Sequence, residues 1–431
     1  MRLRVLVCVV AFGLPCGAAA QETVPSAPPE APKAEEALAP RLGRFRVGRM
    51  FLTPYFTIGT IGVDANVFFT QTERVRDVTV SGGPGLRLVV PIGRSVKVTG
   101  DGDLNYLWYA EQADQRRLMG NAVGRVDWDG PKFGLGVGTT YGRSFQRIDF
   151  EVDQRVDQTT KQLSANGRLG NSEGGVMLTP EVSVRRYEVA DPPGGSFNGL
   201  SRSLSRDELR ALVPVRFKLT PKTWFVLEGE YSDFGFLYDA NRDGILYRVG
   251  AGFEVQSSTR LSGRVVAGPS VFKPRDKRLD SFTSPWVNAE LRYAVGLRTS
   301  FESRYARTVG YSATSTGSTV APVRTNEEVI AAWTQRLVGR FGTRLWGGVT
   351  RFETLGEATV PGTSNSVVEK RKDKIWQGGL DLTFEVAPKL TMGVGGYYTE
   401  RKSNVQVFGV NGLSFGVIFN YAGPVKVAFR P

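Results

Sequence analysis

Histidine is absent from this 431-residue chain, and cysteine occurs only at Cys8 and Cys16. Without an imidazole, the usual general base of Ser–His and Cys–His hydrolases is missing. Because both cysteines precede residue 21, the rest of the chain has no thiol for a disulfide, for thiolate chemistry or for a Cys- or His-ligated metal. We therefore expect no enzymatic activity, no cofactor and no metal site.

The first 20 residues contain an apolar run at 5–14 that is too short to span a bilayer as a helix. Arg2 and Arg4 precede this run, and three alanines at 18–20 follow it, which is the pattern of a secretory signal peptide. We predict that residues 1–20 are such a peptide, exported through the Sec pathway and cleaved near Ala20. A retained N-terminal membrane anchor is the alternative.

The next segment, residues 21–47, has no periodic apolar pattern. Its first part, QETVPSAPPEAPKAEEALAP, is rich in Pro, Ala and Glu, so we predict a disordered periplasmic lead-in that is too short to be a plug domain. The formal net charge of the chain is +13; residues 1–20 contribute +2 and residues 21–40 contribute −3, which leaves +14 for the rest. In an exported protein this positive charge indicates that the chain binds an anionic polymer or an anionic lipid headgroup, or simply that its loops and lumen walls are rich in Arg; it does not indicate nucleic-acid binding.

Residues 284–296, SPWVNAELRYAVG, show the pattern that recurs through the chain. Val287, Ala289 and Leu291 alternate with Asn288 and Glu290, so a strand would have one apolar and one polar face. A helix would scatter the two sets around its axis. Similar alternation occurs at 96–108, 118–128, 133–142, 209–219, 245–255 and 413–421.

Short turns alternate with longer polar connections, which is typical of outer-membrane barrels. The longer connections are 111–115, 147–157, 191–204, 238–243, 274–282, 312–322 and 355–367. Counting hairpins predicts an all-β, transmembrane, antiparallel up-and-down β-barrel over 48–421, with about 18 strands (16–18) and both termini in the periplasm. Residues 422–431 are then a tail or the end of the last strand.

A soluble β-sandwich or propeller would also show alternation. Its strands are usually shorter than those expected here, and no blade-length repeat is visible, so the membrane barrel is favoured. Residues 326–337 contain good helix formers behind Thr325, but Val329, Ala331 and Trp333 keep the two-residue period. We predict a strand there.

The polar face of these strands supplies the candidate functional residues. Its positive and negative charges nearly balance, which predicts either a wall of crossed ion pairs or an anion-selective strip. The pairs Glu228/Glu230 and Asp101/Asp103 could also serve acid–base chemistry on a glycan, although pairing with neighbouring arginines is the simpler interpretation. The candidate lumen-lining residues are Lys97, Asp101, Asp103, Arg125, Asp127, Arg210, Arg216, Lys218, Glu228, Glu230, Arg248, Glu254, Arg264, Glu290, Arg292, Arg298, Glu302, Arg304 and Arg336.

Aromatic residues gather near the ends of the predicted strands. Such residues form girdles at the two membrane interfaces of outer-membrane barrels. The candidate girdle residues are Trp108, Trp128, Trp224, Trp286, Trp376, Tyr398 and Tyr421.

Several strand-and-turn segments resemble the β-barrel porin 2 family of outer-membrane proteins. They are LTPYFTIGTIGVDANVFFT at 52–70, RDVTVSGGPGLRLVVPIGR at 76–94, the segment 219–255 and RLSGRVVAGPSVFKPRD at 260–276. The resemblance covers residues 48–421 and implies a Gram-negative outer-membrane location. Some members resemble barrels that work with polysaccharide-export machinery, which implies a role in exopolysaccharide or capsule export.

The resemblance also implies partners. These are outer-membrane lipids and lipopolysaccharide, the barrel-assembly machinery, which recognises an aromatic-ended last strand similar to 413–421, and a periplasmic polysaccharide-export protein. The expected function is therefore a porin-like channel for hydrophilic material, with exopolysaccharide or capsule as the substrate. The alternatives are a general diffusion porin for small solutes and a non-transporting structural barrel.

Overall fold

The computed structural model describes residues 45–64, 66–68, 74–147, 155–170, 173–191, 199–255, 260–312, 322–337, 339–356, 358–359, 367–368, 370–387, 390–405 and 409–421. The predicted signal peptide, the lead-in as far as residue 44 and the tail 422–431 lie outside the described residues. So does the side chain of Tyr421.

Long antiparallel strands make up most of the described chain, because the alternating segments pair with their sequence neighbours. The only α-helix of the described part, α1, has five residues, and none of its helices could cross a membrane. The elements are β1 (Phe45–Val47), β2 (Met50–Asp64), β3 (Asp77–Ile92), β4 (Val96–Tyr109), β5 (Arg117–Asp129), β6 (Phe133–Arg147), β7 (Arg155–Leu169), β8 (Val176–Leu178), β9 (Glu181–Val189), α1 (Leu200–Leu204), β10 (Arg206–Thr220), β11 (Thr223–Phe236), β12 (Gly244–Val255), β13 (Leu261–Pro274), β14 (Phe282–Val295), β15 (Thr299–Tyr311), β16 (Val323–Arg336), β17 (Phe341–Thr354), β18 (Ala358–Thr359), β19 (Val367–Val368), β20 (Lys372–Ala387), β21 (Leu390–Ser403) and β22 (Val410–Tyr421).

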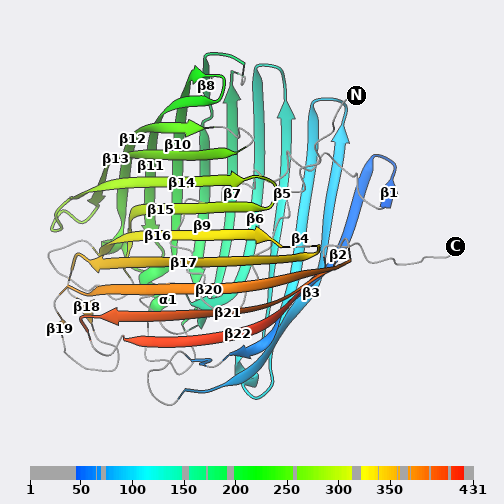
Figure 1. The fold of residues 1–431 in the computed structure, drawn as a ribbon. Coiled ribbons are helices and arrows are strands. Elements are labelled where there is room, and N and C mark those ends of the chain that lie inside the picture. The colour runs from blue at the N-terminus through cyan, green and yellow to red at the C-terminus, as the bar shows by residue number, and fades with distance from the viewer. Residues whose placement is uncertain are drawn as a thin grey trace.

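The sheet closes on itself (Figure 1). Successive strands pair in sequence order, and β22 returns to β2 through four residue pairs that include Ile61↔Val417. β8 and β9 together occupy one position between β7 and β10, with Pro180 in the gap between them. The described residues therefore form a closed antiparallel barrel of eighteen strands, which confirms the predicted fold.

Two sequence expectations near strand boundaries have different outcomes. Residues 326–336 of this segment form a strand, as predicted, because β16 pairs along its length with β15 and β17 and tertiary pairing overrides its helix propensity. Residues 45–47, which the sequence assigned to the disordered lead-in, instead form β1 and pair with residues 50–52 of β2. The turn at Gly48, with φ of 61°, makes this short hairpin possible.

The barrel has two unlike ends. One, called here the turn end, carries the short connections, such as 93–95, 221–222 and 296–298. The other, called here the loop end, carries longer connections, such as 190–205, 237–243 and 275–281. β2 starts and β22 finishes at the turn end, because Tyr421 pairs with Leu390 beside the short β20–β21 connection.

Each strand has one exposed apolar face. Directly opposed residues share a face, so the ladders link Leu227 with Ala251 and Val265 with Ala289 around the outside. Large apolar side chains on this face are strongly exposed, for example Val249 at 63% and Leu291 at 47%. Charged residues in the turn half and the middle of the strands occupy the other face, which lines the inside of the closed barrel (the lumen). Near the loop end the outward face also carries charges, such as Asp233 and Glu327.

Candidate functional site: the lumen of the barrel

The register places the sequence-predicted lumen residues on this inward face, with one exception. Lys97 is opposite Asp127, Glu290 is opposite Arg304, and Lys218 is opposite Trp224. The exception is Arg298, which lies exposed in the turn between β14 and β15 and not on a strand. Its position follows from the end of β14 at Val295, three residues earlier than a continuous alternation would require.

A buried network of arginines and glutamates covers the inward face of β9 to β13. Glu230 accepts hydrogen bonds from Arg210 at 2.9 Å and from Arg248 at 3.1 Å. Its side chain is only 5% exposed. Such a carboxylate needs both partners, since an unpaired charge away from water is costly.

The same network continues toward the turn end. Arg264 donates to Glu228, and Arg216 donates to Glu254 at 2.9 Å. The Glu228/Glu230 pair is therefore engaged by guanidinium groups, as the ion-pair interpretation predicts.

The second carboxylate pair, Asp101 and Asp103, lies on β4, opposite Arg87 and Gly85 of β3. Asp101 accepts hydrogen bonds from Arg87 and from the hydroxyl of Tyr55, each at 2.8 Å. Tyr55 belongs to β2, so these contacts join three neighbouring strands on the inward face. Asp101 is thus part of the wall of ion pairs as well.

The turn half of the lumen is open to water. Arg292 and Glu302, 3.5 Å apart, have side chains that are 57% and 45% exposed. Arg125 and Asp127, 2.6 Å apart, are 24% and 30% exposed. Charges on the same face become progressively buried toward the loop end, so the lumen is a wet vestibule at one end and a packed structure at the other.

Three buried apolar clusters, called here the mouth clusters, fill the inward side of the loop end. The second and third combine strand ends with a connection that folds over them. The first contains Phe236, Leu246, Phe272, Val309, Tyr311 and Val323; the second contains Val156, Val189, Leu200 and Leu204; the third contains Val67, Leu107, Tyr109 and Phe145.

Contacts across the barrel reinforce these clusters. Arg155 at the start of β7 pairs with Asp64 at the end of β2 at 2.7 Å, although β3 to β6 separate the two strands along the wall. Both side chains are buried, at 7% and 6% exposure. Arg155 also donates to the hydroxyl of Tyr109. The loop-end mouth is therefore narrowed by side chains that meet over the lumen.

Sequence reasoning missed these mouth residues because they lie where strands were expected to have ended. Residues 147–157 were predicted to be an external loop, yet β7 already begins at Arg155. Arg371 and Asp373, both fully buried and 2.7 Å apart, likewise follow a predicted loop. The sequence signal that could have found Arg155, Arg371 and Asp373 is that each is a charged residue within a few residues of a long connection.

One rim connection outside the strands has a strongly perturbed carboxyl group. In the β13–β14 connection, hydrogen bonds from the Arg278 side chain and backbone hold the pKa of Asp276 at about 2. This carboxyl therefore stays ionised at any physiological pH. The neighbouring Arg275 bonds both carboxylate oxygens of Asp233 on β11, at 2.7 and 2.6 Å.

Aromatic side chains form two belts on the outward face. Near the turn end, Phe217, Phe225 and Phe253 lie in a row with ring centroids 6.3 and 5.7 Å apart. Nearer the loop end, Tyr231 and Tyr247 have centroids 5.5 Å apart.

The spacing of the belts fits a bilayer. On β4, Trp108 lies twelve residues from Val96, which is the partner of Trp128 on β5. That is about 40 Å of strand, or about 30 Å along the barrel axis at a tilt of about 40°.

The girdle prediction is wrong for two residues. Trp224 is fully buried and Trp286 is 5% exposed, and both face inward. Their register explains this, since Trp224 is opposite Lys218 and Glu254 on the charged face. By contrast Trp128, Trp376 and Tyr398 are 46%, 43% and 42% exposed on the outward face, where Trp108 also lies.

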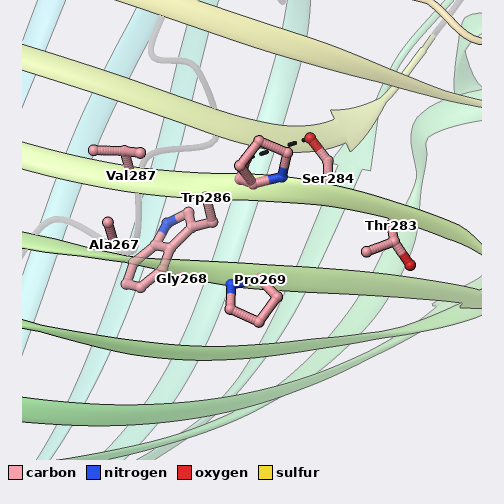
Figure 2. A pocket seen from close by; sticks show the side chains of 8 residues that line it. Ala267, Gly268, Pro269, Thr283, Ser284, Trp286 and Val287 are labelled. Atoms are coloured by element: carbon pink, nitrogen blue, oxygen red, sulfur yellow. Dashed lines mark hydrogen bonds between the residues drawn. The ribbon is translucent and has the colours of Figure 1, made fainter.

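Trp286 packs on the inside of the wall over two glycines. Figure 2 shows its indole reaching from β14 toward Gly268 on β13. A Cβ at Gly250 on the next strand would lie 2.5 Å from the indole, so only glycine fits there. Val226, Val266 and the guanidinium of Arg248 complete the surroundings of the ring.

A closed barrel with an apolar outer band, aromatic belts and a charged lumen defines an outer-membrane β-barrel of the porin type. Residues 43–419 match the family described as "Putative beta-barrel porin 2", and the chain belongs to that family. No curated protein matches it.

Solved structures with a similar fold include outer-membrane proteins of three bacteria. The alcaligin outer-membrane receptor FauA from Bordetella pertussis is 14% identical, with a TM-score of 0.45 over 89% of this chain and 67% of FauA. OpdL from Pseudomonas aeruginosa is 13% identical, with a TM-score of 0.47 over 87% of this chain and 99% of OpdL. The FrpB iron transporter from Neisseria meningitidis is 10% identical, with a TM-score of 0.46 over 85% of this chain and 67% of FrpB.

The outward face gives a first testable prediction. Val249→Arg places a charge between the two belts of β12, where the side chain is 63% exposed to lipid. We expect the free energy of unfolding to fall by about 2–4 kcal/mol, measured by urea titration of the barrel in lipid vesicles. Thr140→Arg, on the inward face of β6, is the control and should cost much less because it faces water. Equal losses for the two variants would contradict the assignment of faces.

Proposed function

We propose that this barrel conducts hydrophilic material across the bacterial outer membrane, with an exopolysaccharide or capsular polymer as its substrate class. The observation that carries the proposal is the inward face, which is charged along its length and wet in its turn half, where Arg292 and Glu302 are half-exposed. Guanidinium and carboxylate groups suit the hydroxyl and acidic groups of a polysaccharide. The family resemblance to polysaccharide-export barrels supports the substrate class.

The proposal includes an orientation. The turn end, with both ends of the barrel, faces the periplasm, and the loop end faces the outside, as in other outer-membrane barrels. Lipopolysaccharide and phospholipid would then contact the aromatic belts. The barrel-assembly machinery would insert the chain, and a periplasmic polysaccharide-export protein would meet the open vestibule.

A general diffusion porin for small solutes is the second candidate. The mouth clusters favour it, because a narrowed mouth suits a small solute better than a polymer. A purely structural barrel is supported less well, since Arg125 and Asp127 on the inward face remain accessible to water in the turn half.

Conductance of the purified, refolded barrel in a planar bilayer tests the proposal. We expect ion conductance that acidic oligosaccharides block more strongly than neutral ones when added from the turn-end side. Block by small sugars alone would favour the diffusion porin. A barrel that stays silent with every solute, and whose deletion leaves surface polysaccharide unchanged, would refute the channel.

A further inference from the structure

The β15–β16 hairpin extends beyond the last residue pair between β15 and its other neighbour, β14. β15 and β16 stay paired as far as Tyr311↔Val323. The ladder between β14 and β15, however, stops at Val287↔Arg307. Residues 308–312 therefore have no ladder to β14 within the described chain. Together with residues 322–325, which stay beside β17 through Arg324↔Thr354 and Thr325↔Glu353, they are called here the hairpin tip.

Pro285 explains why this ladder stops. Because β13 and β14 pair without a break through Pro269↔Pro285, these prolines form a non-hydrogen-bonded pair, and the N–H that each lacks would face the opposite neighbour. For Pro285 that neighbour is β15. If the register of Val287↔Arg307 continued, the next hydrogen-bonded pair would be Pro285↔Val309, which the proline cannot complete. The ladder ends one step before the proline.

Pro269 shows the same effect on the other side. Its missing N–H faces β12, and the β12–β13 pairing skips from Arg248↔Ser270 to Ala251↔Ala267. There the two strands nevertheless remain side by side, since a Cβ on Gly268 would lie 1.9 Å from the carbonyl oxygen of Val249. Only at Pro285 does the neighbouring strand leave the wall.

The hairpin tip leans inward across the mouth. The ring of Tyr311 packs against Phe236 of β11 and Phe272 of β13, with centroids 4.7 and 5.5 Å apart. The guanidinium of Arg206 on β10 lies 5.7 Å from the same ring, although four strands separate β10 from β15.

Hydrogen bonds fix the tip on both flanks. Arg242, in the connection after β11, donates to the carbonyl of Ser312, and Arg248 of β12 donates to that of Val309 at 3.5 Å. On the other flank the amide of Leu355, just after β17, donates to the carbonyl of Val323 at 3.0 Å. Val323 itself is fully buried.

The wall has a depression along the part of β14 that has no ladder to β15. It measures about 360 Å³ and lies beside Pro269, Trp286 and Val287 (Figure 2). Its lining is almost wholly apolar.

We infer that the hairpin tip is the constriction of the channel, that Tyr311 is the positioning residue that seats it in the first mouth cluster, and that Pro285 removes the backbone N–H that the departure of the tip from β14 would otherwise leave unpaired. The inference rests on the proposed channel function. The narrowest part of the conduction path then lies at the loop end and is formed by the end of β15 and the start of β16.

Conductance of Tyr311→Ala tests the constriction. Removing the ring unseats the tip, so we expect a several-fold larger single-channel conductance than in the unmodified barrel. Tyr305→Ala is the matched control, because Tyr305 has the same parity on β15 but lies where β15 still pairs with β14, and its hydroxyl donates to Glu327; its conductance should not change. An unmodified barrel that conducts, with Tyr311→Ala identical to it, would overturn the inference while leaving the channel intact.

A labelling experiment separates failure of the constriction from failure of the channel. Val323→Cys should resist a charged, membrane-impermeant maleimide in the otherwise unmodified protein and react rapidly when combined with Tyr311→Ala. Tyr238→Cys, at a loop position that is 61% exposed, should react in both backgrounds. Rapid labelling of Val323→Cys alone would show that the tip is not seated, and a barrel that stays silent after the tip is released would show that the tip does not close the path.

Discussion

Glu230→Gln is expected to destabilise the barrel by about 3–5 kcal/mol, because it leaves Arg210 and Arg248 buried without their shared counter-charge. The two guanidinium groups lie 2.9 and 3.1 Å from the carboxylate and are 15% and 13% exposed. Glutamine keeps the shape and one acceptor oxygen, so the loss reports charge and not packing. Urea-induced unfolding in lipid vesicles measures it.

The control for this prediction is Glu302→Gln. Its ion pair with Arg292 is longer, at 3.5 Å, and both partners are about half-exposed. An exposed pair contributes only about 0–1 kcal/mol, so this variant should be close to the unmodified barrel. If both glutamines cost the same, the buried network would not be the stabilising feature that its geometry indicates.

The Glu230 network also shows what the sequence could predict. Alternation in β10 to β13 was enough to place Arg210, Glu230 and Arg248 on one inward face, because a strand has a fixed period of two. It could not predict which acid meets which arginine, since that depends on the stagger between strands. Register emerges only when turns and side chains on both sides are satisfied together.

The two misplaced tryptophans illustrate the limit differently. Trp224 and Trp286 are aromatic residues near strand ends, and that fact alone suggested the membrane interface. Their parity already placed them with Glu254 and Glu290 on the charged face, as the structure shows. Parity, which backbone geometry enforces, is thus a better guide than residue type. The inward lean of the hairpin tip, by contrast, depends on packing between strands that are far apart in the sequence.

Pro285→Val is expected to lower the free energy of unfolding by about 2–3 kcal/mol, because it creates a backbone N–H that faces the place vacated by β15. The barrel could instead satisfy this N–H by returning β15 to the wall. That would withdraw Val309 and Tyr311 from the mouth cluster, at about 1.5–3 kcal/mol for each large apolar side chain. The second cost is larger, so the tip should stay seated and the N–H should stay unpaired. Urea titration in vesicles gives the loss.

Pro269→Val is the matched control, because its new N–H faces β12, which remains in the wall with the carbonyl of Val249 beside it. That substitution can complete a ladder and should be neutral or stabilising. Combining Pro285→Val with Tyr311→Ala should then cost less than the two separate losses together, since an unseated tip is free to pair with β14. Strict additivity, or equal losses at the two prolines, would contradict the assignment of Pro285 as the residue that lets the tip leave β14 without an unpaired N–H. The packing of Tyr311 therefore decides where the two strand ends lie, and the missing amide of Pro285 lowers the cost of holding them in the constriction.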